Sequence, residues 1–291
     1  MVRKVFGALA VSMLLTVAAA GQEDLLDVFV VRVKPEKRAD FDAVSKKIAD
    51  ANRRNKGSTW VASETVYGEG DVVMFVSTRH GYAEIEKSSE AFMGALIKSY
   101  GSAGAAKLIQ DGGKCFLSSR SEVRRRRWDL SANAPQDAAA FAKLVGGTRY
   151  IRTTTVHVRP GHVLDFEAHA KDAKAAWEKA NPQVPLLVSQ ADVGQHGTVF
   201  YISVFRSSLG AFDGVVPLAK AMGEEDFRKF LSGAAESVQG AEYVINHFLP
   251  ELSNPPEDFV AASPDFWRPK PKAPAKPKAA EAGMPSAKQK Q

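Results

Sequence analysis

Histidine is the residue in this chain best suited to acid–base or ligand chemistry, because the imidazole titrates near neutral pH. None of the six histidines pair in a metal-ligand spacing such as HxH or HExxH, so we predict no metal site. His157 and His247 fall on two predicted strands that should be neighbours in a sheet, so their imidazoles could approach one another. The competing interpretation is two half-buried strand residues bonded to backbone or water.

His169 is the most suggestive histidine, because it stands on the apolar stripe by which a predicted helix faces its sheet. An imidazole directed into a pocket there could ligate haem or act as a general base, and Trp177 is close in sequence. No sequence motif assigns either role to His169, so we predict no cofactor. Haem is the only cofactor that the residues around His169 suggest, and it can be tested. The candidate ligand-binding residues are His157, His169, Trp177 and His247, and no catalytic residue is assigned.

The run Arg124–Arg127, followed by Trp128, has the composition of a segment that binds phosphate or nucleic acid. It follows a predicted strand in a region of little net charge. We expect an edge strand kept soluble by its arginines, or arginines paired with the acidic residues Glu224, Glu225 and Asp226.

The net charge of +6 belongs to the two ends of the chain. Arg3 and Lys4 contribute +2 and residues 268–291 contribute +6, which leaves −2 for the region between them. A nearly neutral folded region argues against nucleic acid as a partner.

The first residues have the pattern of a secretory signal peptide: Arg3 and Lys4, then an apolar run from Val5 to Ala20, then polar residues. The run is shorter than a membrane span and ends in three alanines. We expect cleavage near Ala20 and a periplasmic or secreted protein without a transmembrane span.

Cys115 is the only cysteine, so no intramolecular disulfide can form. It falls in a predicted strand without an obvious basic partner, which indicates a small buried apolar residue. Stability must therefore come from a core, for which 45% hydrophobic residues provide ample material.

An internal repeat organises the rest of the chain. The motif V-K-P followed by D-F-D-A in residues 33–43 recurs as V-R-P followed by D-F-E-A in residues 158–168, at a constant offset of 125. In this alignment His169 takes the place of Val44. Order and spacing persist beyond the motif, which favours two copies of one unit.

Each copy carries the same predicted elements, a strand, a helix, a hairpin, a second helical region and a last strand. A proline follows the first strand of each copy, and the second helical region should break near Gly101 and Gly223. The predicted strands include residues 28–33, 60–67, 72–78 and 114–119 in the first copy and residues 186–191, 198–205 and 241–248 in the second.

The order β-α-β-β-α-β is that of a ferredoxin-like unit, whose helices cover one face of the sheet. Residues 72–76 and 199–202 are nevertheless apolar on both faces, so the other face also needs cover. We predict an α+β fold in which two tandem ferredoxin-like repeats pack sheet to sheet as one intrachain α+β barrel. The expected segments are a signal peptide at 1–20, repeat 1 at 22–131, a linker with a short helix at 132–147, repeat 2 at 148–256 and a disordered Pro/Ala/Lys-rich tail at 257–291.

The segments VFVVRVKPEKRADFDAVSKKIADANRR and TTTVHVRPGHVLDFEAHAKDAKAAWEKAN resemble the start of dimeric α+β-barrel domains, the superfamily of antibiotic-biosynthesis-monooxygenase-like and NIPSNAP-like proteins. The resemblance covers most of residues 25–254. It implies a barrel of two such units, from two chains or one, with ligand pockets between sheet and helices. Its members include oxygenases, isomerases and haem-handling enzymes, and in haem-degrading relatives a helix histidine works beside Asn and Trp, as His169, Asn181 and Trp177 would here.

These observations leave three functions open. The first is a binding protein for a small apolar or amphipathic ligand, or for a protein partner, between the repeats. The second is a cofactor-free monooxygenase-like or haem-handling enzyme. The third is a structural envelope protein tethered by its basic tail to an envelope surface or an anionic polymer. Whether the chain is an enzyme, and whether it forms a homodimer, is left open.

Overall fold

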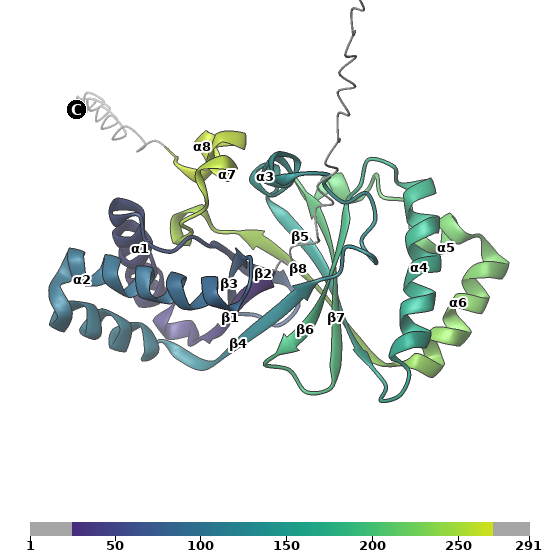
Figure 1. Cartoon of the computed structure of the whole chain (residues 1–291), viewed down its shortest axis with the longest axis horizontal. Helices are drawn as coiled ribbons and strands as arrows, with labels where there is room; N and C mark the ends of the chain where they lie inside the picture. The colour runs from purple at the N-terminus through teal and green to yellow at the C-terminus, as the bar shows by residue number, and fades with distance from the viewer. Residues whose placement is uncertain (1–24, 270–291) are drawn as a thin grey trace, which may run out of the picture.

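The structure, a computed structural model, describes residues 25–269, in which eight strands close into an antiparallel barrel with helices outside it (Figure 1). The predicted signal peptide and the residues from 270 onward lie outside the described part of the chain. No helix within residues 25–269 is long and apolar enough to cross a bilayer.

The elements follow the predicted order in both halves of the chain. The first half contains β1 (Leu25–Val33), α1 (Arg38–Asn55), β2 (Val61–Tyr67), β3 (Val72–Arg79), α2 (Tyr82–Gly113) and β4 (Phe116–Arg126). The second half contains β5 (Tyr150–Val158), α4 (Val163–Ala180), β6 (Leu186–Val193), β7 (Thr198–Arg206), α5 (Leu218–Met222), α6 (Glu224–Ser237) and β8 (Val238–Phe248). The remaining helices are α3 (Ala138–Gly147), α7 (Glu257–Ala262), α8 (Pro264–Trp267) and the short 3-10 turns Pro35–Lys37, Gly210–Phe212 and Pro250–Leu252.

Proline and glycine set the boundaries as the sequence predicts. Pro35 has no N–H to continue the β1 ladder and opens a 3-10 turn that leads into α1. Gly101 interrupts α2 with φ 68°, and Gly223 separates α5 from α6 with φ 81°. Both backbones lie in the left-handed region that glycine adopts without a Cβ penalty.

Backbone hydrogen bonds close the barrel in the order β1-β3-β2-β8-β5-β7-β6-β4, with β4 returning to β1. The two halves meet at both edges, through β2 with β8 and through β4 with β6. The sequence predicted sheets packed face to face. In the structure the edge strands of the two halves are also joined by hydrogen bonds, so neither half has an unpaired edge strand. The inner faces of the two halves meet across the barrel.

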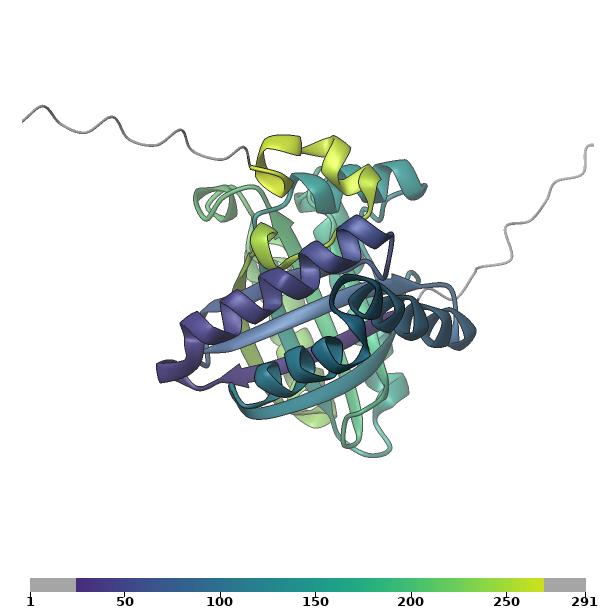
Figure 2. The same ribbon diagram turned by 90° about the vertical axis from the view of Figure 1, so that its left-hand side faces the viewer.

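Helices cover the outer face of the barrel on two sides (Figures 1 and 2). On one side Phe41 of α1 packs on Val31, Val33 and Val73 of the sheet. On the other side Phe166 of α4 packs on Phe200 of β7, with ring centroids 4.6 Å apart. These contacts explain why α1 and α4 each carry an apolar stripe. They also explain why the strands are apolar on both faces, since one face meets a helix and the other faces the barrel interior.

The end of the barrel is covered by α3, α7 and α8 (Figure 1). Trp267 is 1% exposed and its Nε1 donates to the carbonyl of Gly146 at 2.9 Å, while α3 and α7 pack on each other. The prediction that the chain leaves the fold after Pro256 is therefore wrong for residues 257–268. Their apolar side chains pack on the core. Pro256 is the N-cap of α7, and Pro264 opens α8 in its first turn.

Candidate functional site

A cavity of about 630 Å³ lies between the helices of the second half and the outer face of the sheet. We call it the second-half cavity. Most of its wall is apolar and comes from α4, α6 and strands β5 to β8. Two of the predicted site residues, His169 and Trp177, lie in this wall. Since both are on α4, the structure brings these two candidates to one site.

His169 turns its ring toward α6. A Cβ placed on Gly233 would lie only 2.1 Å from Nε2 of His169, so this nitrogen rests against the helix backbone. The ring of Phe230 approaches edge-on, with centroids 6.4 Å apart. The imidazole thus forms part of the cavity wall, with its Nε2 face covered by α6.

Trp177 and Asn181 are engaged with the backbone. The indole Nε1 of Trp177 donates to the carbonyl of Val184 at 2.9 Å. Asn181 bonds both the N–H and the carbonyl of Val216 through its amide, at 2.8 and 3.1 Å. Their polar groups are therefore used to hold loops, and only the indole ring of Trp177 is offered to the cavity.

This arrangement does not fit haem ligation by His169. The nitrogen that would face an iron atom is covered by Gly233, and the neighbouring Trp and Asn side chains are bonded to backbone. No cluster of three or more His, Cys, Asp or Glu side chains in residues 25–269 could hold a metal ion.

A second cavity, of about 510 Å³, lies under α1 and α2 against the outer face of β1, β3 and β4. We call it the first-half cavity. Five phenylalanine rings line it. Four of them contact one another at centroid distances of 6.0 to 6.3 Å: Phe29, Phe41, Phe75 and Phe116. The fifth, Phe92, packs on Trp60 at 5.9 Å. Val44, the counterpart of His169 in the repeat, lies in this wall.

Asp27 and Arg79 form the polar end of the first-half cavity. Arg79 is 5% exposed, and its guanidinium donates to Ser58 Oγ at 2.9 Å and to the carbonyl of Thr59 at 3.2 Å. Burial raises the pKa of the Asp27 carboxyl, and the positive charge of Arg79 opposes that rise. Sequence reasoning missed this pair, although a single Asp within the apolar strand Leu25–Val33 was a usable signal.

His157 and His247 lie on neighbouring strands, as predicted, but their imidazoles do not approach one another. In the register between β5 and β8, His157 lies opposite Gly240, whereas His247 lies opposite Tyr150 at the other end of the pair. The ring of His247 packs on Tyr150 with centroids 4.7 Å apart. Burial lowers the pKa of His247, with Arg149 adding to the effect and Glu64 opposing it.

The arginine run is not an exposed edge. Its first three members lie in β4, which is paired with β1 and β6, and Arg124 is 7% exposed. Arg127 ties β4 to α4 and β6 by donating to Glu167 at 2.6 Å and to Gln190 at 2.7 Å.

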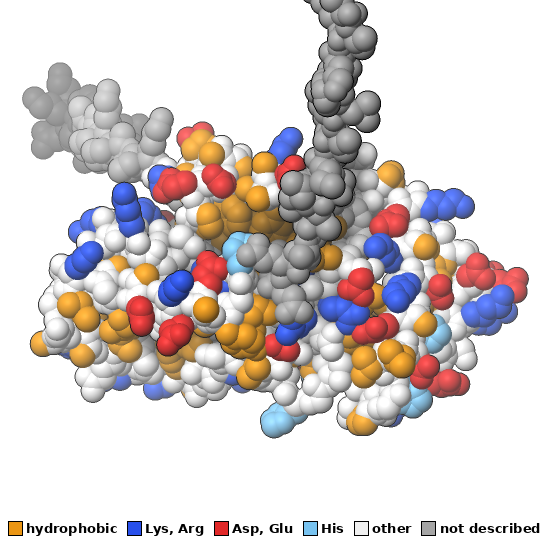
Figure 3. Space-filling view, in the orientation of Figure 1, with side chains coloured by type: hydrophobic (Ala, Val, Ile, Leu, Met, Phe, Trp, Pro, Cys, Tyr) orange, Lys and Arg blue, Asp and Glu red, His pale blue; other side chains and the backbone are white. Residues whose placement is uncertain are grey.

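The acidic residues expected to pair with the arginine run bind other partners. Glu224 pairs with Arg228, and Glu225 pairs with Lys229, along α6. On the face shown in Figure 3, acidic and basic side chains are intermixed, in line with the nearly neutral folded region.

The comparisons with known proteins concern the fold. No protein-family model matches the sequence, and no curated protein matches it. Among solved structures, an anthrone oxidase-like protein is 13% identical with a TM-score of 0.52, over 79% of this chain and 92% of that chain. A putative monooxygenase from Lactobacillus acidophilus is 9% identical with a TM-score of 0.46, over 78% and 94% of the two chains. A heme-binding protein from Thermus thermophilus is 13% identical with a TM-score of 0.44, over 80% and 93%. The likeness at this level of identity, together with the closed eight-stranded barrel, is that of an α+β-barrel fold.

Proposed function

We propose that this chain binds small amphipathic molecules in its two helix-covered cavities. The observation that carries the proposal is the size of the cavities, about 630 and 510 Å³. Folded interiors leave few voids larger than a water molecule, whereas dedicated small-molecule pockets span about 300–1,000 Å³. Two cavities of that size in corresponding places favour ligand binding over imperfect packing.

The wall chemistry favours a ligand with a long apolar part and a small polar group. Aromatic and aliphatic side chains make up most of both walls. The side chains that can carry a charge at neutral pH are few, Asp27 and Arg79 in the first cavity and His169 and Lys174 in the second, and the other polar groups are mostly hydroxyls. In such a pocket the affinity comes from burial of the apolar part of the ligand, and one or two polar contacts determine which ligand is bound.

The correspondence between the cavities supports a second part of the proposal, that the halves are tandem copies of one ferredoxin-like unit of the monooxygenase-like or NIPSNAP-like kind. Along the barrel the strands run β4-β1-β3-β2 in one half and β8-β5-β7-β6 in the other. The glycines at 101 and 223 interrupt corresponding helices, and Val44 and His169 line corresponding cavities.

An enzyme of the monooxygenase-like or haem-handling kind is the alternative function. His169 in a mostly apolar wall favours the monooxygenase-like form, in which it would act as a base, whereas its contact with Gly233 argues against haem ligation. Haem added to the purified chain tests the haem-handling form directly. A Soret shift in the wild type that is lost in His169→Ala would support it, whereas no shift in either protein would exclude it.

Export is a further part of the proposal, supported by the charged and apolar pattern of residues 3–20. The basic residues from 268 onward suit either a solubilising spacer or a tether to an anionic envelope polymer. Retention of the chain on cell-envelope fractions, measured with and without residues 268–291, separates these two roles.

Filling each cavity tests the binding function. Val44→Phe places a ring in the first-half cavity and Ala173→Phe places one in the second-half cavity. The controls Ala43→Phe and Ala175→Phe put the same ring on exposed positions of α1 and α4. Binding of a medium-chain alcohol, measured by calorimetry, should fall in the filled variants and persist in the controls. Equal binding by all four would refute the proposal.

A further inference from the structure

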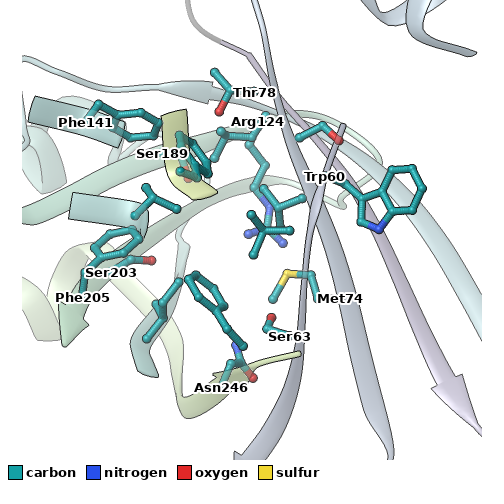
Figure 4. A pocket seen from close by; sticks show the side chains of 18 of the residues that line it. Trp60, Ser63, Met74, Thr78, Arg124, Phe141, Ser189, Ser203, Phe205 and Asn246 are labelled. Carbon is teal, nitrogen blue, oxygen red and sulfur yellow. The ribbon is translucent and has the colours of Figure 1, made fainter. Parts of the chain in front are cut away.

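The barrel interior holds a third cavity, of about 140 Å³, on the inner side of the sheet (Figure 4). All eight strands contribute side chains to its wall, and α3 and α7 close its end with Phe141, Val145 and Phe259. It is distinct from the two helix-covered cavities, which lie on the outer side of the sheet.

Arginine provides the only charged side chains of this wall within the described residues. Arg124 and Arg126 line the cavity, and no carboxylate does so. Figure 4 shows the Arg124 side chain reaching in among Ser63, Met74 and Ser203. The cavity wall itself therefore presents only positive charge, and the carboxylate of Glu122 that pairs with Arg124 lies behind this wall.

Arg124 is held rigidly by groups outside the cavity wall. Its Nε donates to Glu122 Oε2 at 2.8 Å, and its guanidinium lies 3.5 Å from the centre of the Tyr201 ring. Glu122 in turn accepts from Arg120, Gln195 and the hydroxyl of Tyr201. One edge of the guanidinium is fixed, and the other is presented to the cavity.

Four sets of polar groups face this cavity. The Nη atoms of Arg124, the hydroxyls of Ser63 and Ser189, and Nδ2 of Asn246 have no hydrogen-bond partner within residues 25–269, and they border the cavity instead of being enclosed by protein atoms. Polar groups in such a position bind water or a ligand. Because they converge from four strands on one small space, they suit a ligand with several acceptor oxygens.

We infer that the barrel interior binds a small carboxylate with a short apolar tail. A guanidinium fork matches a planar carboxylate, and the three polar side chains can complete its hydrogen bonds. Met74, Phe205 and Phe248 provide the apolar part of the wall for the tail. A cavity of about 150 Å³ holds a benzene-sized molecule, so the tail is limited to a few carbons.

Calorimetric titration with pentanoate and with its neutral isostere pentanamide tests the inference. Arg124→Lys keeps a positive charge beside Glu122 but removes the two-pronged guanidinium that would bind the carboxylate. Ser189→Leu fills the cavity and leaves Arg124 itself unchanged. Ser119→Leu, on the exposed part of β4, is the matched control for the leucine, and Val44→Phe fills the first-half cavity instead.

We expect pentanoate to bind at least about tenfold more tightly than pentanamide, and both interior variants to weaken it by a similar factor. Ser119→Leu should bind as the wild type does. If Arg124→Lys fails to fold, Ser189→Leu decides the matter alone. Equal affinity for pentanoate and pentanamide, no binding of either, or binding abolished by Val44→Phe would overturn the inference.

Discussion

His169 on α4 and Gly233 on α6 are packed directly against each other, with room for a hydrogen but not for a methyl group between them. Because these two helices cover the second-half cavity, the contact fixes how closely they approach over it. A small residue at 233 is thus required by the position of the histidine.

Gly233→Ala should therefore destabilise the chain. The added Cβ would lie 2.1 Å from Nε2 of His169, and overpacking of this kind costs about 1–3 kcal/mol, which outweighs the gain of at most about 1 kcal/mol in helix propensity. Gly94→Ala in α2 is the control, since no neighbouring heavy atom lies within 4 Å of its Cβ. Urea unfolding should show the first variant less stable and the second equal to or more stable than the wild type. Equal stability of the two variants would show that His169 moves without cost.

Glu122→Gln should lower the free energy of unfolding by on the order of 3 kcal/mol at neutral pH, because it leaves the buried Arg124 without its charge partner. Although burial opposes ionisation, Arg124 and Arg120 hold the pKa of Glu122 below its usual range. A depressed folded-state pKa gives stability that is complete above about pH 4.3 and is lost as the pH falls through the folded-state value. The difference between wild type and variant, measured by denaturant unfolding, should thus shrink on acidification below about pH 4. A difference independent of pH would contradict this role of the carboxylate.

Truncation should separate the last helices from the residues beyond them. A chain ending at Arg268 should unfold as the full chain does, whereas a chain ending at Pro256 loses buried Val260 and Trp267. Removal of a buried Trp alone costs about 3–5 kcal/mol, so the shorter chain should melt at a clearly lower temperature. Equal melting temperatures of the two truncated chains would restore the prediction of a tail starting at 257.

Cys115 should react with a thiol reagent only when the chain unfolds. Its side chain is 2% exposed, and burial raises the pKa of the thiol, which disfavours the reactive thiolate. Labelling followed by mass spectrometry should show little modification in buffer and complete modification in denaturant. Rapid labelling of the native chain would mean that β4 opens readily near its start.

The sequence allowed the secondary structure and the barrel to be predicted because local and global signals agree. Proline after the first strand, glycine within the second helical region and strands apolar on both faces each have a direct structural cause. The terminal helices were missed because the tail was taken to begin directly after Pro255-Pro256. The apolar pairs Phe259-Val260 and Phe266-Trp267 were the better signal.

The candidate sites were harder to predict, since they depend on register and on three-dimensional packing. The relative positions of His157 and His247 follow from the β5–β8 register, which no residue pattern specified. Arg124 was taken as part of a charged edge strand because a run of arginines is typical of a solvated surface, and only the structure reveals Glu122 and Tyr201 beside it. His169 and Trp177 both line the second-half cavity, since they lie on the same helix and face the sheet from it.

Native mass spectrometry of the full chain purified from its host is the most direct test of ligand binding in the helix-covered cavities. We predict a noncovalent adduct of one or two small molecules that is released on denaturation and is diminished in Val44→Phe and Ala173→Phe. The bare mass of the chain, unchanged after incubation with medium-chain alcohols and carboxylates, would contradict it.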